Sequence, residues 1–175
     1  MRYLFVIDYQ KDFVDGALGF PGAEKLDEGI AAKIRQYQKN GDLIVQTMDT
    51  HHPDYLSTRE GKHLPVLHCL EGSDGWQLHS DIAKLIRTTP FDKPTFGSLE
   101  LAGYLKDLND RAKLEEVELI GLCTDICVIS NAMILKAAFP DVPISVDGSC
   151  CAGVTMESHR IALDAMKAVQ IEIKG

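Results

Sequence analysis

The sequence predicts a three-layer α/β/α fold with a mainly parallel sheet, formed by residues 1–175 as a single domain. Two observations predict this class. Short apolar runs of strand length alternate with longer segments that have helical spacing, which is the order of elements in a parallel sheet. In addition, 175 residues with 45% hydrophobic and 25% charged residues have the size and composition of one ordinary globular domain.

The strand-like runs end at residues that carry chemistry. The predicted strands cover residues 3–7, 43–48, 116–121, 144–146 and 170–173, and an extended piece over residues 87–91 leads to Lys93. Five side chains follow such runs: Asp8, Asp49, Lys93, Cys127 and Asp147. The carboxyl ends of parallel strands share one edge of a sheet, where ligands bind, so we expect these five to converge. The loop after Asp147 is expected to contain Gly148 and the pair Cys150–Cys151.

Helix formers and stop signals predict the covering layers. The expected helices span residues 23–40, 78–85, 98–108, 128–138 and 155–169. Residues 50–75 are different, because they hold several histidines and prolines and show little periodicity. We interpret that region as a long functional loop.

Charge and composition exclude several classes of protein. A net charge of −8 leaves no basic stripe for a nucleic acid. No apolar run is long enough to span a membrane. Met1–Tyr3 leads directly into a strand, so no cleavable signal is expected. The five cysteines have no disulfide spacing, which predicts free thiols and a cytoplasmic location.

The stretch Gly121–Val128 is the strongest candidate for a nucleophile. It lies between a buried strand and a helix, which places Cys127 in the first helical turn. The unpaired N–H groups and the helix dipole there favour negative charge and are expected to lower the pKa of the thiol. The same N–H groups could bind an oxyanion. The alternative is a buried, inert cysteine.

A cysteine nucleophile needs a group that removes and returns a proton. Asp8 could do this if the charge of Lys93 lies beside it, and Lys93 would also help to hold the thiolate. The alternatives are a turn aspartate and a solvated lysine. A cysteine–histidine pair is the weaker arrangement, because the histidines near predicted strand ends all belong to the long loop.

The long loop has the composition of a metal site. Asp49 and His51 are two residues apart and point the same way on an extended segment. His68 follows, with Glu60 or Ser57 between. A carboxylate with two imidazoles suits Zn²⁺, Mn²⁺ or Fe²⁺ with open positions. The alternative is a polar loop whose histidines bind nothing, as we expect for His52 and His63.

Four blocks of the chain together resemble one family. They are Val6–Phe13; Asp49–His51 with His68–Cys69 and Gly72–Gly75; Lys93–Phe96; and Gly121–Val128. In these blocks the chain resembles the isochorismatase-like cysteine hydrolases, within them the nicotinamidase/pyrazinamidase branch. The family has a Rossmann-like fold of the class predicted above.

The resemblance implies an Asp–Lys–Cys triad of Asp8, Lys93 and Cys127. It also implies a cis peptide before Cys123, and an oxyanion hole formed by the backbone N–H groups of Cys123 and Cys127.

The resemblance further implies a divalent metal, usually zinc with manganese or iron as alternatives, on Asp49, His51 and His68. The fourth ligand would be Glu60, or Ser57. This metal would bind the pyridine nitrogen of the substrate.

The chain departs from the family pattern in the part of the pocket wall that would bind the ring of the substrate. Relatives often have a tryptophan a few residues before the metal histidine, where this chain has Leu64–Pro65. Phe13 and Phe96 are therefore the expected aromatic walls of the substrate pocket.

The expected activity is hydrolysis of a small-molecule amide, most specifically nicotinamide to nicotinate and ammonia through a Cys127 thioester, as in NAD salvage. One alternative is another small amide or carbamoyl compound. The other is a non-catalytic binding or redox domain, although a binder would not need all three triad residues. The resemblance also implies a homo-oligomer.

Overall fold

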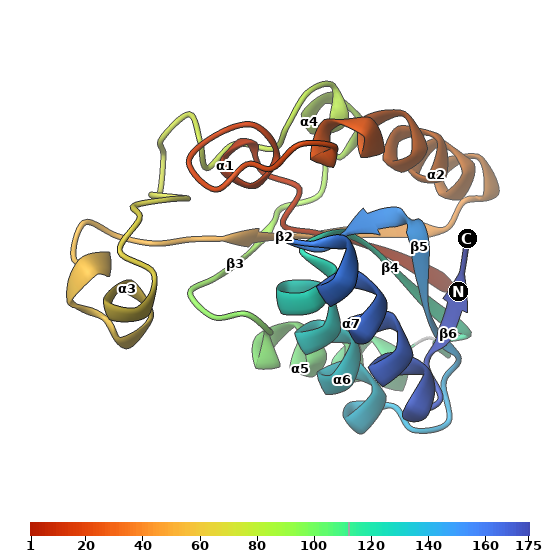
Figure 1. Ribbon diagram of the computed structural model, residues 1–175. Coiled ribbons are helices and arrows are strands. Elements are labelled where there is room, and N and C mark those ends of the chain that lie inside the picture. The colour runs from red at the N-terminus through yellow and green to blue at the C-terminus, as the bar shows by residue number, and fades with distance from the viewer. Residues whose placement is uncertain (112) are drawn as a thin grey trace.

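The computed structural model describes residues 1–111 and 113–175, which build one six-stranded sheet (Figure 1). In chain order the strands are β1 (Arg2–Ile7), β2 (Leu43–Asp49), β3 (Phe91–Lys93), β4 (Glu116–Leu122), β5 (Ile144–Ala152) and β6 (Glu172–Lys174). In space the order is β3-β2-β1-β4-β5-β6, and every adjacent pair is parallel. The mainly parallel sheet predicted from the sequence is confirmed.

Helices cover both faces of this sheet. One face carries α1 (Lys11–Val14), the 3₁₀ turn η1 (Ala23–Leu26), α2 (Asp27–Asn40) and α4 (Ile82–Leu85). The opposite face carries α5 (Leu99–Arg111), α6 (Ile129–Ala138) and α7 (Met156–Ala168) (Figure 1). Side chains of β1 alternate between the two layers: Phe5 packs in the core of the α5–α7 face and Val6 in the core of the other. The three-layer prediction is confirmed.

The predicted long loop contains two short helices. The 3₁₀ turn η2 (Tyr55–Ser57) and α3 (Arg59–His63) lie in a segment that extends beyond the end of β2 (Figure 1). We call residues 50–70 the α3 arm. The hydroxyl of Thr58 caps α3 by accepting a hydrogen bond from the N–H of Gly61.

The prediction that Asp147 ends a strand is wrong. Strand β5 continues to Ala152 after an irregularity in its pairing with β4, so Gly148 and Cys150–Cys151 lie in the strand and not in a loop. Asp147 pairs in register with Lys174 of β6, and its carboxylate lies 2.7 Å from Lys33 Nζ of α2. It therefore does not join the other strand-end residues. A bulge lets parallel pairing resume after polar residues that otherwise signal a turn.

Several boundaries also differ from the sequence prediction. Only residues 82–85 of the segment 78–85 are helical. The segment predicted as a helix over 128–138 begins earlier, with the π-helical turn η3 (Thr124–Val128) before α6. No helix among the described residues is long and apolar enough to cross a membrane.

Candidate active site

Asp8, Lys93 and Cys127 come from three different strand ends. Asp8 follows β1, Lys93 is the last residue of β3, and Cys127 lies in η3 after β4. Lys93 pairs in register with Asp49 of β2, so its long side chain crosses β2 to reach the end of the central strand β1. The convergence predicted for these residues and Asp49 is confirmed.

The three side chains are in contact and nearly excluded from solvent. Lys93 Nζ lies 2.5 Å from Asp8 Oδ2 and 3.5 Å from Cys127 Sγ. The other oxygen of Asp8 accepts a hydrogen bond of 2.7 Å from the hydroxyl of Thr47. Asp8 has a φ of 43°, a left-handed conformation that costs about 1–3 kcal/mol in a residue other than glycine. The surrounding contacts hold the backbone of Asp8 in a conformation that it would not adopt alone.

The electrostatics differ from the sequence expectation at Cys127. Burial and the neighbouring Asp8 raise the pKa of the Cys127 thiol, and Lys93 offsets only part of this. The expected lowered pKa is therefore wrong, because the first helical turn is buried beside a carboxylate. Burial also raises the pKa of Asp8, against the opposing charge of Lys93. Burial acts against the charge of Lys93, but Asp8 and Cys127 outweigh it and raise the pKa of the ammonium.

The nucleophile turn is tied to its surroundings by Asn131, which the sequence analysis did not single out. Its side-chain amide donates to the carbonyl of Cys127, at 2.8 Å, and to that of Phe96, at 3.2 Å. Its oxygen accepts a hydrogen bond from the N–H of Ser98. The peptide bond before Cys123 is cis, in agreement with the resemblance.

A second cluster lies beside the triad, at the end of β2. The structure brings together Asp49, His51 and His68 so that their potential ligand atoms all lie within 4.8 Å of one another. The Nε2 atoms of His51 and His68 are 3.0 and 3.4 Å from Asp49 Oδ2. Glu60 Oε1 faces both rings, at 3.7 and 3.9 Å from the same nitrogens. This geometry is a candidate metal centre of one or two carboxylates and two imidazoles.

Three observations fit a metal ion here. His51 Nε2 is buried and makes no hydrogen bond, although Asp49 is near. His68 Nδ1 lies 2.8 Å from the carbonyl of Val66, which favours a proton on Nδ1 and leaves Nε2, beside Asp49, as the nitrogen that can bind a metal. Burial opposes ionisation of Asp49, but the two imidazoles and Lys93 outweigh it and hold the pKa of this carboxyl below its usual range. An ionised carboxylate is the form that binds metals. Burial lowers the pKa of His68, but Asp49 and the carbonyl of Val66 outweigh it and raise that pKa, so a metal that binds here would displace a proton from this imidazole.

The remaining candidates of the α3 arm lie elsewhere. Ser57 is exposed, and its hydroxyl donates to the carbonyl of Asp54, so the geometry favours Glu60 as a fourth ligand. His52 is exposed beside Glu71, and exposed His63 contacts the carbonyl of Arg59.

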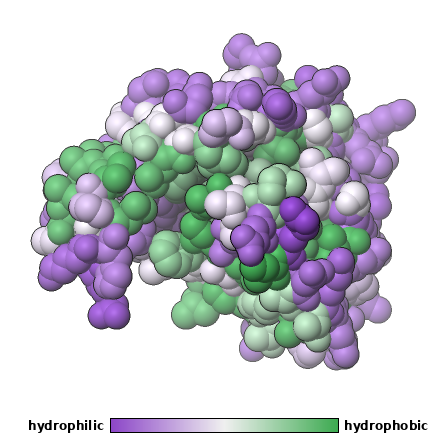
Figure 2. Space-filling model, in the orientation of Figure 1, coloured by the Kyte–Doolittle hydropathy of each residue, from purple (hydrophilic) through white to green (hydrophobic). Residues whose placement is uncertain are grey.

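One small cavity joins the two clusters. Its volume is about 60 Å³, and it is lined by Phe13, Leu18, Asp49, Glu60, Leu64, His68, Phe96, Cys123, Ile126 and Cys127. The expected aromatic walls, Phe13 and Phe96, are both present. The sequence did not single out Leu18 or Ile126 as cavity residues. The only signal for Leu18 was its place as an apolar residue between two loop glycines, and the only signal for Ile126 was its place directly before the nucleophile. Hydrophobic surface covers part of the α3 arm and continues towards the body of the molecule (Figure 2).

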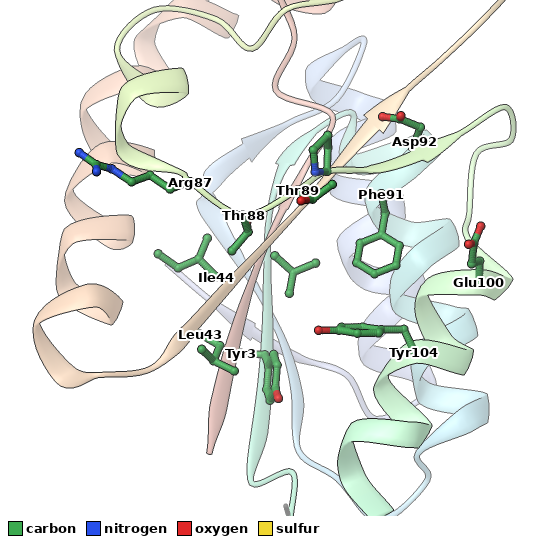
Figure 3. A pocket seen from close by; sticks show the side chains of 12 residues that line it. Tyr3, Leu43, Ile44, Arg87, Thr88, Thr89, Phe91, Asp92, Glu100 and Tyr104 are labelled. Atoms are coloured by element: carbon green, nitrogen blue, oxygen red, sulfur yellow. The ribbon is translucent and has the colours of Figure 1, made fainter. Parts of the chain in front are cut away.

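A larger hollow has different chemistry. It has a volume of about 720 Å³ and lies between β2, β3 and α5, where Phe91 and Tyr104 line one side (Figure 3). Among the described residues that line it there is no cysteine, histidine or lysine. The smaller cavity, and not this hollow, therefore has the groups that a cysteine hydrolase needs.

Comparison with known proteins identifies the family of this chain. The isochorismatase domain family matches residues 2–174, so the chain belongs to the isochorismatase family. It is 30% identical to the isochorismatase family protein PncA of Bacillus subtilis, over 93% of this chain and 92% of the relative. It is 25% identical to the nicotinamidase/pyrazinamidase of Mycobacterium tuberculosis, over 99% and 98%. The zinc complex of Pyrococcus horikoshii pyrazinamidase superposes with a TM-score of 0.82 at 25% identity, covering 98% of this chain and 97% of the other.

Proposed function

We propose that this protein is a cysteine amidohydrolase that converts nicotinamide to nicotinate and ammonia. The observation that carries the proposal is the small cavity lined both by Cys127 and by the candidate metal ligands Asp49, Glu60 and His68. A small substrate with an amide at one end and a metal-binding atom at the other would contact both. Nicotinamide has this form.

In the first half of the reaction, Cys127 Sγ attacks the amide carbonyl carbon and its proton passes to Asp8. The raised pKa of Asp8 suits a group that must accept and then release a proton. The oxyanion is held by the N–H groups of Cys123 and Cys127. Asp8 then returns the proton to the amide nitrogen, the C–N bond breaks, ammonia leaves and a thioester remains on Cys127.

In the second half, water replaces ammonia. Asp8 removes a proton from this water, which attacks the thioester carbonyl, and the C–S bond breaks. The proton on Asp8 returns to Cys127, and the carboxylic acid product gives up its own proton to water to become nicotinate. Lys93 keeps its charge throughout, because its pKa is raised, and it compensates for whichever of Asp8 and Cys127 is negative.

Asp49, His51, His68 and Glu60 would hold a divalent ion, for which zinc is our proposal. When bound, it supplies a Lewis acid for the pyridine nitrogen and so orients the amide towards Cys127. Phe13 lies with its ring centre 5.7 Å from that of His68, so it would pack against the ring beside the ion.

A second substrate class has one observation in its favour. Leu18 and Leu64 line the cavity, and neither can stack on an aromatic ring as a tryptophan would. A small aliphatic amide or carbamoyl compound would also fit apolar walls of this kind.

Ammonia release from nicotinamide and from benzamide tests the proposal. The two amides share their shape, but benzamide lacks the ring nitrogen. We expect nicotinamide to be hydrolysed with the higher kcat/KM, and the difference to disappear when the metal is removed by a chelator. Turnover of a carbamoyl compound with no turnover of nicotinamide would replace our proposal with the alternative.

A further inference from the structure

Two polar residues after Asp8 have no role in the proposed chemistry. Gln10 lies between β1 and α1 and is completely buried, and Asp12 lies in α1. A buried amide must be hydrogen-bonded, so its partners show what it holds.

Gln10 forms hydrogen bonds with both backbone polar groups of Asp49. Its Oε1 accepts a hydrogen bond of 2.7 Å from the N–H of Asp49, and its Nε2 donates to the carbonyl of Asp49 at 2.9 Å. The same Nε2 donates to the carbonyl of Trp76 at 2.9 Å. Pairing of β1 with β2 ends at Thr47, two residues earlier. The amide of Gln10 therefore takes the place of the missing strand partner for Asp49.

Asp12 holds the residue after His68. Its Oδ2 accepts a hydrogen bond of 2.7 Å from the N–H of Cys69, and its Oδ1 accepts from the N–H of Ala17 at 3.1 Å. Cys69 has a φ of 45°, which is uncommon for a residue other than glycine and must be held by its contacts. Its carbonyl in turn accepts from the N–H of His51 at 2.9 Å.

The carboxylate of Asp12 reaches Cys69 only because Gly75 has no side chain. A Cβ atom at Gly75 would overlap all three atoms of the carboxyl group. The φ of Gly75 is not positive, so alanine is compatible with the backbone there. The substitution Gly75→Ala can therefore test the contact between Asp12 and Cys69 without changing the charge of Asp12.

We propose that Gln10 and Asp12 are positioning residues that hold the two metal-binding segments in register with Asp8. Gln10 sets Asp49, and Asp12 sets His68 and, through Cys69, the backbone of His51. The chain that carries the proton acceptor of the triad thereby also sets the geometry of the candidate metal centre. The inference rests on the metal centre of the proposed function but not on its substrate.

Zinc affinity measured by competition with a chromophoric chelator tests the inference without any substrate. We expect Gln10→Met and Asp12→Asn to weaken zinc binding by about 10–100-fold, the usual effect of losing a group that orients metal ligands. Gly75→Ala should weaken it in the same direction by displacing the carboxylate of Asp12.

Asp147→Asn is the matched control. Asp147 is a hydrogen-bonded carboxylate like Asp12, although it is buried and Asp12 is half-buried, and it lies on β5, three strands away from β2. Its loss should lower the Tm and leave the zinc affinity within about twofold, because its contacts do not reach the metal segments. KM for nicotinamide should rise in the positioning variants while kcat at saturating zinc and substrate changes little.

The outcomes separate the two proposals. Folded Gln10→Met, Asp12→Asn and Gly75→Ala variants that bind zinc as the wild type does would overturn the inference and leave the proposed function intact. If zinc binding falls as expected but the wild type does not hydrolyse nicotinamide, the positioning role stands and the substrate assignment fails. A wild-type protein that does not bind zinc would overturn the inference.

Discussion

The triad and the candidate metal centre lie side by side but are built in different ways. Asp8, Lys93 and Cys127 are at most 4% exposed and lie at or shortly after strand ends of the sheet. The metal centre takes only Asp49 from a strand, and its other members come from the α3 arm, where Glu60 remains partly exposed. One region is held by the sheet and the other by hydrogen bonds from Gln10, Asp12 and the backbone.

This difference indicates that the two regions have different roles. A nucleophile and its proton acceptor need fixed contact, which neighbouring strands supply. Substrate-orienting groups vary more readily when they lie on a connecting segment supported by the sheet. Lys93 links the two regions, because its Nζ lies 3.8 Å from Asp49 Oδ1 as well as in contact with Asp8 and Cys127.

The largest effect should come from the nucleophile. We expect Cys127→Ala to lower kcat by at least about 10³-fold while the protein stays folded and its zinc affinity is unchanged. Ammonia release measures kcat, and chelator competition measures the zinc affinity. Cys123→Ser, Cys150→Ser and Cys151→Ser should keep most of the activity, since no side-chain role in catalysis is proposed for them. More than a few per cent of wild-type activity in Cys127→Ala would place the nucleophile elsewhere.

Lys93→Met should damage both regions. It leaves Asp8 buried without its ion pair, and breaking such a pair costs about 3–5 kcal/mol of unfolding free energy. Urea unfolding followed by circular dichroism measures that cost, and zinc competition measures the effect on Asp49. An exposed lysine that pairs with Asp81, Lys84, is the control, and Lys84→Met should change neither quantity. Unchanged stability of Lys93→Met would contradict a buried pair.

Removal of the metal should affect substrate binding more than the nucleophile. We expect a chelator, or His51→Ala, to raise KM for nicotinamide at least about tenfold, because the ring nitrogen loses its partner. Alkylation of Cys127 by iodoacetamide should continue at a similar rate, since it depends on Asp8 and Lys93. His63→Ala, in the same arm but exposed, should leave KM unchanged. An equal KM for nicotinamide with and without metal would show that the metal ligands of the α3 arm take no part in substrate binding.

The smallest effect concerns pH. Burial and Asp8 raise the pKa of Cys127, so only a small fraction of the thiol is ionised at neutral pH. The alkylation rate should therefore still increase above pH 9, beyond the ordinary cysteine pKa of about 8.5. Mass spectrometry of the modified peptide gives this rate at each pH. A plateau below pH 7 would show instead that the charge of Lys93 outweighs burial.

The sequence by itself determined the class of fold and most of the chemistry. Alternation of short apolar runs with helical segments is a local property, and it sufficed for the parallel sheet of three layers. The rule that parallel strands share a carboxyl edge then placed Asp8, Asp49, Lys93 and Cys127 together. The motifs around Cys127 and Asp49 supplied the family, which the match over residues 2–174 confirms.

Only the tertiary structure decided the local environments, because burial and neighbouring charge are not local in sequence. Helix position alone predicted a lowered pKa for Cys127, whereas its packing against Asp8 raises it. A turn signal predicted the end of a strand at Asp147, but β5 continues to Ala152 and pairs again with β4 at Cys151. Likewise, the contacts of Gln10 with Asp49 and of Asp12 with Cys69 join residues 39 and 57 positions apart. Such contacts exist only once the chain has folded, so no pattern of neighbouring residues could have predicted them.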